Sequence, residues 1–359
     1  FGYESEIYDA LLDQFEPGAK SAEIETAFAG LRTDLVELIG KISNASKKPD
    51  IGILKRPYDV AKQKVFAEAV GAAIGYDFDG GRIDDTVHPC CNDLGPHDVR
   101  VLTRFCPNDL GAGLTGTTHE VGHALYDMSR DNKEHWGTPF GETPSLAIHE
   151  SQSRTWENIV GRSREFWVYF YPQLQRIFHD ELGNVSLDDF YGVMNWVSPS
   201  FIRVEADEAT YNLHVMLRFE LERAIIRGVL KAADIPGEWN KRFKDYLGIE
   251  IDKDSNGCLQ DVHWAHGAFG YFATYALGNL YAAQFWTQAQ KDLPNLAEDF
   301  SRGKFDRMLV WLRDNIHSQG FKYYPNDLCK RLTGEPLSHK ALLDYLYGKY
   351  ADIYGISRG

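Results

Sequence analysis

Apolar residues spaced three and four positions apart predict that this chain is mainly helical. In the clearest run, six apolar residues keep this spacing: Ile24, Phe28, Leu31, Leu35, Leu38 and Ile42. Asp50 and Pro57 mark the end of that region, and residues 58–74 predict a second helix. Helical patterns return at about Thr115 and continue to Tyr354. Five prolines mark breaks between these helices: Pro172, Pro199, Pro236, Pro294 and Pro325.

The pattern between the two helical regions is different and predicts strands. Residues 76–84 place a Gly80-Gly81 turn signal between two short runs, which is typical of a hairpin. Val99, Val101 and Thr103 then alternate with polar or large residues. We expect a small sheet of two or three strands. No segment rich in Gly, Ser or Pro divides the chain, so residues 1–359 predict a single mainly α domain.

Residues 262–290 contain no Asp, Glu, Lys or Arg, a length that could span a bilayer. The segment nevertheless carries His263, His266, Asn279 and three tyrosines. We therefore expect a helix buried in a large protein core, with its polar groups facing a cleft.

Charge and cysteine content narrow the classes of partner. The 359 residues contain 38 Lys and Arg against 52 Asp and Glu, a net charge of −14. This acidic balance argues against nucleic acid and anionic membranes as partners. The five cysteines form no CxxC motif, which favours a reducing compartment and a cytoplasmic location. The adjacent Cys90 and Cys91 are assigned to packing.

The strongest chemical signal is the segment His119-Glu120-Val121-Gly122-His123. On a helix, two histidines four positions apart share a face and can bind one cation. Glu120 lies beside them, where it can act on a metal-bound water. The preceding residues 111–116 are glycine-rich and are expected to form a flexible lead-in. The alternative is a surface helix with two unrelated histidines.

A catalytic zinc site needs a third protein ligand as well as an open position for water. The metzincin pattern is excluded because Tyr126 and Ser129 occupy its glycine and histidine positions. His149, Glu150 and Glu157 are the remaining candidates. Either glutamate could ligate while the other supports the site, and Glu157 has a simpler alternative as an ion-pair partner of Arg154 or Arg162. Spacing leaves the choice open, with Glu150 slightly favoured.

Three further motifs follow the HExxH segment along the chain. Their sequences are His149-Glu150-Ser151-Gln152, Ile202-Arg203-Val204-Glu205-Ala206-Asp207 (IRxxAD), and Gly257-Cys258-Leu259-Gln260-Asp261-Val262-His263-Trp264 (GxxQDxHW). With the HExxH segment, the chain resembles the thermostable carboxypeptidase (carboxypeptidase Taq) family of zinc metallopeptidases over its whole length. The resemblance implies a mainly α fold with a deep active-site cleft and a small sheet beside the HExxH helix.

The chain departs from the family pattern at three places. The family's HPF motif appears as His88-Pro89-Cys90, without the aromatic residue, and Ala273 stands where the family usually has proline. Family chains also carry a further N-terminal block of helices that helps to wall the cleft. We therefore expect this sequence to be a segment of a longer protein, or a processed one, that lacks the block.

The resemblance implies roles for individual residues. His119, His123 and Glu150 would ligate one divalent metal, with zinc expected and cobalt or manganese as alternatives. Glu120 would be the general base. Arg203 would grip the free carboxylate of a substrate, because a guanidinium binds carboxylates through two hydrogen bonds. The alternative for Arg203 is a helix-face ion pair with Asp207.

The uncharged segment supplies further candidates. Residues 266–275 also resemble thimet-type oligopeptidases, which implies that His266, Tyr271 and Tyr275 support the oxyanion and hold the substrate. Gln260 and His263 are placed in the substrate-binding group, Gln260 as a residue that orients its neighbours and His263 in a supporting role. The alternative for each is a hydrogen-bonded core residue.

Together these features predict a metal-dependent carboxypeptidase that removes one C-terminal amino acid per cycle from peptide substrates. The family resemblance adds a homodimer. One alternative is a zinc oligopeptidase with the same chemistry but no preference for a free C-terminus. The other is a truncated, non-catalytic fragment that binds metal and serves as an interaction unit.

Overall fold

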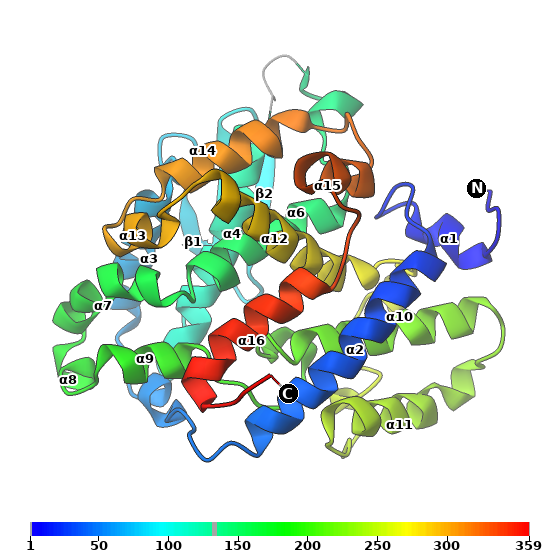
Figure 1. The fold of residues 1–359 in the computed structure, drawn as a ribbon, viewed down its shortest axis with the longest axis horizontal. Helices are drawn as coiled ribbons and strands as arrows, with labels where there is room; N and C mark the ends of the chain where they lie inside the picture. The colour runs from blue at the N-terminus through cyan, green and yellow to red at the C-terminus, as the bar shows by residue number, and fades with distance from the viewer. Residues whose placement is uncertain (1, 131–134, 359) are drawn as a thin grey trace.

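The computed structural model describes residues 2–130 and 135–358, and it is mainly α-helical, as predicted (Figure 1). The long helices α2 and α3 match the predicted ones closely. The helices are α1 (Ile7–Leu12), α2 (Ser21–Ser43), α3 (Val60–Ile74), α4 (Leu110–Ser129), α6 (Leu146–Arg154), α7 (Arg164–Ile177), α8 (His179–Leu182), α9 (Leu187–Met194), α10 (Tyr211–Ile226), α11 (Ile235–Leu247), α12 (Ala273–Asp292), α13 (Leu296–Ser301), α14 (Asp306–Asn315), α15 (Pro325–Thr333) and α16 (Lys340–Tyr354).

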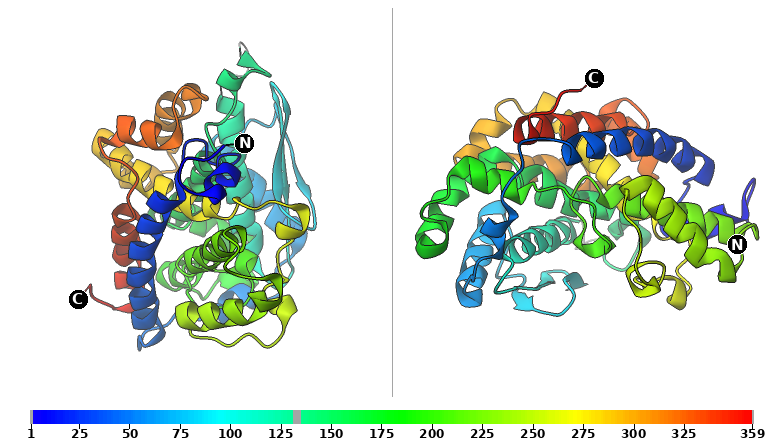
Figure 2. Two further views of the ribbon diagram at one scale, coloured as in Figure 1. Left: turned by 90° about the vertical axis from the view of Figure 1, so that its right-hand side faces the viewer. Right: turned by 90° about the horizontal axis from the view of Figure 1, so that it is seen from below.

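A three-stranded sheet packs against α4, on the side of the molecule away from α2 and α16 (Figure 2). Its strands are β1 (Ile83–Asp85), β2 (Cys90–Gly95) and β3 (Asp98–Thr103), in the order β1-β3-β2. β3 pairs in parallel with β1 and antiparallel with β2. The small sheet beside the HExxH helix is therefore confirmed.

The predicted hairpin around Gly80-Gly81 is wrong. These glycines pass directly along β3 instead of reversing the chain, and the Val99 amide donates to the Gly80 carbonyl at 2.9 Å. A Cβ atom on Gly81 would lie 2.1 Å from the Val99 carbonyl oxygen, so only glycine fits this approach.

The predicted flexible lead-in at residues 111–116 is also wrong, because these residues form the first turns of α4. Asp109 caps the helix by accepting a hydrogen bond from the Ala112 amide at 3.1 Å. A Cβ atom on Gly113 would lie 2.8 Å from the Phe105 ring. The glycines therefore allow close packing of the HExxH helix rather than flexibility.

The uncharged segment does not form the single long helix expected over residues 262–290. α12 begins only at Ala273, and residues 262–272 form a loop that contains one 3₁₀ turn, Trp264–His266. Gly267 ends that turn and Gly270 follows in the loop, with φ angles of 75° and 94°, in the left-handed region that a continuing helix cannot use. Across the described residues, no helix is both long and apolar enough to cross a membrane.

Buried Glu222 on α10 anchors this loop. Its carboxylate accepts hydrogen bonds from the Tyr8 hydroxyl at 2.7 Å, the Trp264 indole at 2.8 Å and the Gly270 amide at 3.2 Å. Burial raises the pKa of Glu222 from 4.5 to about 7 in spite of these donors. A carboxyl group whose folded pKa is raised stabilises the fold fully below the unfolded pKa, and this contribution is lost as the pH rises through the folded value.

We therefore expect the free energy of unfolding to contain a Glu222-dependent fall between about pH 4.5 and 7. Glu222→Gln should flatten this part of the profile by roughly 1–3 kcal/mol, because glutamine does not titrate. Urea unfolding at several pH values measures it. The exposed control Glu23→Gln should leave the profile unchanged, and an equal slope in both variants would contradict the prediction.

Candidate metal centre

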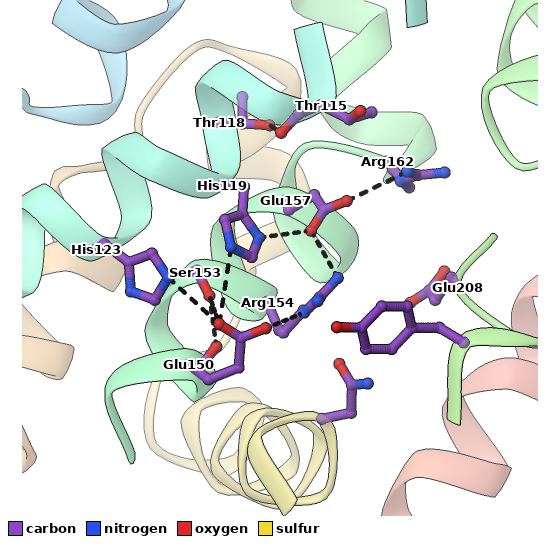
Figure 3. Close-up of polar contacts among 12 residues, drawn as sticks. Thr115, Thr118, His119, His123, Glu150, Ser153, Arg154, Glu157, Arg162 and Glu208 are labelled. Atoms are coloured by element: carbon purple, nitrogen blue, oxygen red, sulfur yellow. Dashed lines mark hydrogen bonds and ion pairs between the residues drawn. The ribbon is translucent and has the colours of Figure 1, made fainter. Parts of the chain in front are cut away.

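The structure brings His119, His123 and Glu150 together at the contact between α4 and α6 (Figure 3). One ligand atom from each lies within 4.8 Å of the other two. Glu150 Oε2 is 3.7 Å from His119 Nε2 and 3.3 Å from His123 Nε2. Both imidazoles therefore point at one carboxylate oxygen, and the alternative of two unrelated surface histidines is wrong. Their side chains keep 18% and 15% of their surface exposed, so solvent can reach the group.

Two glycines allow the close approach of helices that builds this group. A Cβ atom on Gly122 of α4 would lie 2.7 Å from the Ser153 Cα on α6. A Cβ atom on Gly278 of α12 would lie 2.6 Å from the Glu150 Cγ. α6 is therefore held between two helices at distances that any larger residue would change.

Glu157 supports His119 from behind. α6 runs directly into a π-helical turn, Thr155–Val160, which carries Glu157. Glu157 Oε2 lies 2.9 Å from His119 Nδ1 and also binds Arg154 at 3.1 Å. An imidazole that donates from Nδ1 keeps the lone pair on Nε2 for a metal. Glu157 therefore has both of the roles considered from the sequence: it supports His119, and it forms ion pairs with Arg154 and Arg162.

His149 supports His123 in the same way. Its Nδ1 lies 2.5 Å from His123 Nδ1, and its Nε2 lies 2.9 Å from Asp127 Oδ1. When His149 donates to Asp127, its Nδ1 accepts from His123 and leaves His123 Nε2 free. This arrangement favours His149 as a partner of a ligand over a ligand itself. Asp127 was missed by the sequence analysis, although it stands four residues after His123 on the same helix face.

The protonation chemistry of the group suits a divalent cation. Burial and nearby His149 lower the pKa of His123 to about 4, so its imidazole is neutral. Burial opposes ionisation of Glu150, but Arg154 and His119 hold the pKa of this carboxyl well below its usual range. Burial opposes protonation of His119, but the charge of Glu150 and the hydrogen bond to Glu157 raise its pKa. With His119 deprotonated, two imidazole nitrogens and one carboxylate form the donor set of a catalytic zinc-type site. Burial, followed by the charges of Glu150 and Glu157, raises the pKa of Glu120 to about 7.

Arg203 does not pair with Asp207, so that alternative is wrong. Residues 203–205 form a 3₁₀ turn before α10 begins, so the two side chains do not share an α-helix face. Arg203 Nε and Nη2 instead donate to Asp261 Oδ1 at 3.0 and 2.8 Å. Arg218 binds the other oxygen of Asp261 at 2.6 Å. Two arginines on one aspartate leave a buried excess of positive charge.

Gln260 holds the backbone of this cluster. It accepts from the Arg203 amide at 2.8 Å and donates to the Phe201 carbonyl at 3.0 Å. Tyr211 links the cluster to the metal-site residues, because its hydroxyl accepts from Arg203 at 3.1 Å and its ring lies 4.3 Å from the Arg154 guanidinium. Tyr211 and Arg218 had no signal in the sequence.

Three of the aromatic candidates, His263, Tyr271 and Tyr275, pack against one another beside Arg203, and His266 is the exception. Tyr275 donates to the Tyr271 hydroxyl at 3.4 Å, and its ring lies 4.9 Å from the Arg203 guanidinium. The His263 ring is 5.0 Å from that of Tyr271. Burial, together with the charge of Glu150, raises the pKa of Tyr271. His266 is exposed on its 3₁₀ turn, and no described side-chain contact joins it to the three histidine and glutamate candidates.

A helical fold in which HExxH histidines meet a glutamate from a following helix defines a metallopeptidase of the HExxH class. The model of the family "Carboxypeptidase Taq (M32) metallopeptidase" matches residues 1–350. The chain therefore belongs to the M32 family and is a metal-dependent carboxypeptidase, a hydrolase of peptides.

Individual relatives agree with this assignment. The chain is 50% identical over 350 residues to "Thermostable carboxypeptidase 1" of Thermus thermophilus, covering 98% of this chain and 68% of that protein. It is 42% identical to "Carboxypeptidase 1" of Bacillus subtilis, covering 99% and 70%. Among solved structures, the M32 carboxypeptidase from Deinococcus radiodurans R1 matches with a TM-score of 0.95 at 40% identity, covering 97% of this chain and 70% of that one.

Proposed function

We propose that His119, His123 and Glu150 hold one divalent metal ion and that this ion is zinc. The observation that carries the proposal is the convergence of both Nε2 atoms on Glu150 Oε2, at 3.7 and 3.3 Å. Glu157 and His149 support it, because each occupies the Nδ1 of one histidine. The same donor set accepts cobalt or manganese, so metal analysis of the purified protein has to determine which of zinc, cobalt and manganese is bound.

The remaining residues would divide the work of peptide hydrolysis. A metal bound there supplies Lewis acidity, which acidifies a water molecule and polarises the scissile carbonyl. Glu120 takes the proton from the attacking water and passes it to the leaving amine. The Tyr271 and Tyr275 hydroxyls donate hydrogen bonds to the developing oxyanion. The role of His266 in this step stays a prediction.

The excess positive charge around Asp261 would select the free C-terminus of the substrate. Arg203 is only 5% exposed, and Tyr211 and Tyr275 flank its guanidinium. Gln260 and His263 would shape the same pocket wall. A buried cation in aromatic surroundings attracts a carboxylate more strongly than one in water does.

A pair of peptides tests this function. We expect the metal-loaded protein to trim a short peptide with a free C-terminus and to leave its amidated twin intact, with chelator abolishing the reaction. Cleavage of both peptides would favour the oligopeptidase. No cleavage of either, with metal bound, would favour the non-catalytic fragment.

Arg203→Gln should raise KM for the free peptide by roughly 10–100-fold, the equivalent of the 1.5–3 kcal/mol typical of a charged hydrogen bond. It should leave kcat nearly unchanged, because the contact is made equally in the ground and transition states. Steady-state kinetics with both peptides measures this effect. The surface control Arg164→Gln should behave as wild type, and a fall in kcat alone would argue against carboxylate recognition.

We also propose a single catalytic domain, a homodimer and a cytoplasmic location. The first is supported by the continuous helical core, the second by the family resemblance and the third by five cysteines that are all free. Light scattering coupled to size-exclusion chromatography tests the dimer.

A further inference from the structure

The π-helical turn that carries Glu157 is bound from outside by the C-terminal helix. The Asn158 carbonyl oxygen accepts hydrogen bonds from the Tyr345 hydroxyl at 2.9 Å and from Lys349 Nζ at 3.1 Å. Both donors lie on α16, which crosses the molecule beside α2 and α12 (Figure 1). α16 thus binds the backbone of Asn158, which directly follows Glu157, the residue that contacts His119.

The π form of this turn is unusual among helical turns. π turns are rare because their geometry is less favourable than that of the α-helix, and they occur mostly at functional sites. Here the turn places Glu157 Oε2 2.9 Å from His119 Nδ1. Arg162 ties its far end to the Met194 carbonyl at 3.0 Å and to Glu157 at 3.3 Å.

The lysine at position 349 is better explained by its hydrogen bond to the Asn158 carbonyl than by a contribution of its ion pair to the stability of the fold. Lys349 pairs with Glu208 at 2.8 Å, and each side chain is 5% exposed. Exchanging a buried ion pair for apolar residues of similar size is often neutral or stabilising. An apolar residue could therefore fill the space, but it could not donate to the Asn158 carbonyl.

We propose that Lys349 and Tyr345 are positioning residues for the metal centre. By binding the Asn158 carbonyl, they keep the turn in the form that sets Glu157 against His119, and they raise the metal affinity of the site. The inference rests on the proposed metal ligation by His119.

The test uses three variants that separate hydrogen bonding from buried charge. Lys349→Met combined with Glu208→Gln removes the donor without leaving an unpaired charge, and Tyr345→Phe removes only a hydroxyl. Lys340→Met, at the exposed start of the same helix, is the matched control. Zn²⁺ dissociation constants by chelator competition and the absorption spectrum of the Co²⁺ form are measured, along with the melting temperature of each metal-free protein.

We expect the double variant and Tyr345→Phe to weaken Zn²⁺ binding by roughly tenfold, the lower end of the range for outer partners of metal ligands. The Co²⁺ spectrum should shift, and Lys340→Met should match wild type. In a Glu157→Gln background, the same changes should have little further effect, because they act through Glu157.

Unchanged metal affinity in both variants, with or without a lower melting temperature, would overturn the inference and leave a purely structural contact. Equal losses with and without Glu157 would overturn it as well. If wild type itself binds no stoichiometric Zn²⁺, the proposed metal centre fails instead, which keeps the two failures distinguishable.

Discussion

Glu120→Gln should lower kcat for peptide hydrolysis by roughly 10²–10⁴-fold while the protein keeps its metal. Glutamine has nearly the shape of glutamate but cannot accept a proton from water. Glu120 sits between the two histidines in sequence and is only 6% exposed. Burial raises its pKa to about 7, so the carboxyl group is poised to take up and return a proton.

Metal analysis and single-turnover kinetics together test whether Glu120→Gln lowers the rate of the chemical step without loss of metal. We expect equal Zn²⁺ per chain in wild type and Glu120→Gln, with the loss confined to the chemical step. A loss of activity that simply follows a loss of metal would show that Glu120 maintains the site instead of acting as the base. The exposed control Glu23→Gln should keep full activity.

Glu150→Gln should weaken Zn²⁺ binding by more than the roughly 100-fold upper limit that is usual for outer partners of metal ligands. The substitution replaces the anionic oxygen on which both Nε2 atoms converge with a neutral amide. It also removes the ion pair with Arg154 at 2.7 Å, but Arg154 keeps its bond to Glu157 at 3.1 Å. The metal-free variant should therefore still fold.

Glu157→Gln is the matched comparison, because it makes the same chemical change at a residue that contacts the proposed ligand His119 rather than the metal itself. Chelator competition should rank the three proteins as wild type, Glu157→Gln and Glu150→Gln, in order of decreasing affinity. The reverse order for the two variants would make Glu157 the ligand and Glu150 the support. Circular dichroism of the metal-free proteins checks that both remain helical.

The parts of the fold that the sequence predicted well are those encoded by short-range spacing. α2 and β3 follow directly from periods of 3.6 and 2 in their apolar residues. His119 and His123 meet because four residues make about one helical turn. The third metal ligand could be narrowed to a few candidates, among them Glu150, because the helix that carries them follows the HExxH helix closely in the sequence.

The parts that the sequence could not predict depend on distant contacts. Gly80-Gly81 carries the same local signal in a turn and beside a strand, and only the position of β3 decides between them. The alternative of an Arg203–Asp207 ion pair was reasonable for a helix, but Asp261, 58 residues away, binds Arg203 instead. Likewise, nothing near Asn158 indicates that Lys349 would reach its carbonyl, since the two are 191 residues apart.

The packing of α6 between Gly122 and Gly278 has a consequence for how quickly the protein is loaded with metal. Because close contacts at Gly122 and Gly278 fix the spacing of α6 from α4 and α12, we expect the three donor groups to be close together before an ion binds. Binding then requires neither coil-to-helix transitions nor sliding of one helix past another. We expect the association rate to depend linearly on metal concentration, without a plateau, and to be limited by the exchange of water on the ion. A plateau in stopped-flow loading would instead indicate a slow rearrangement of the protein.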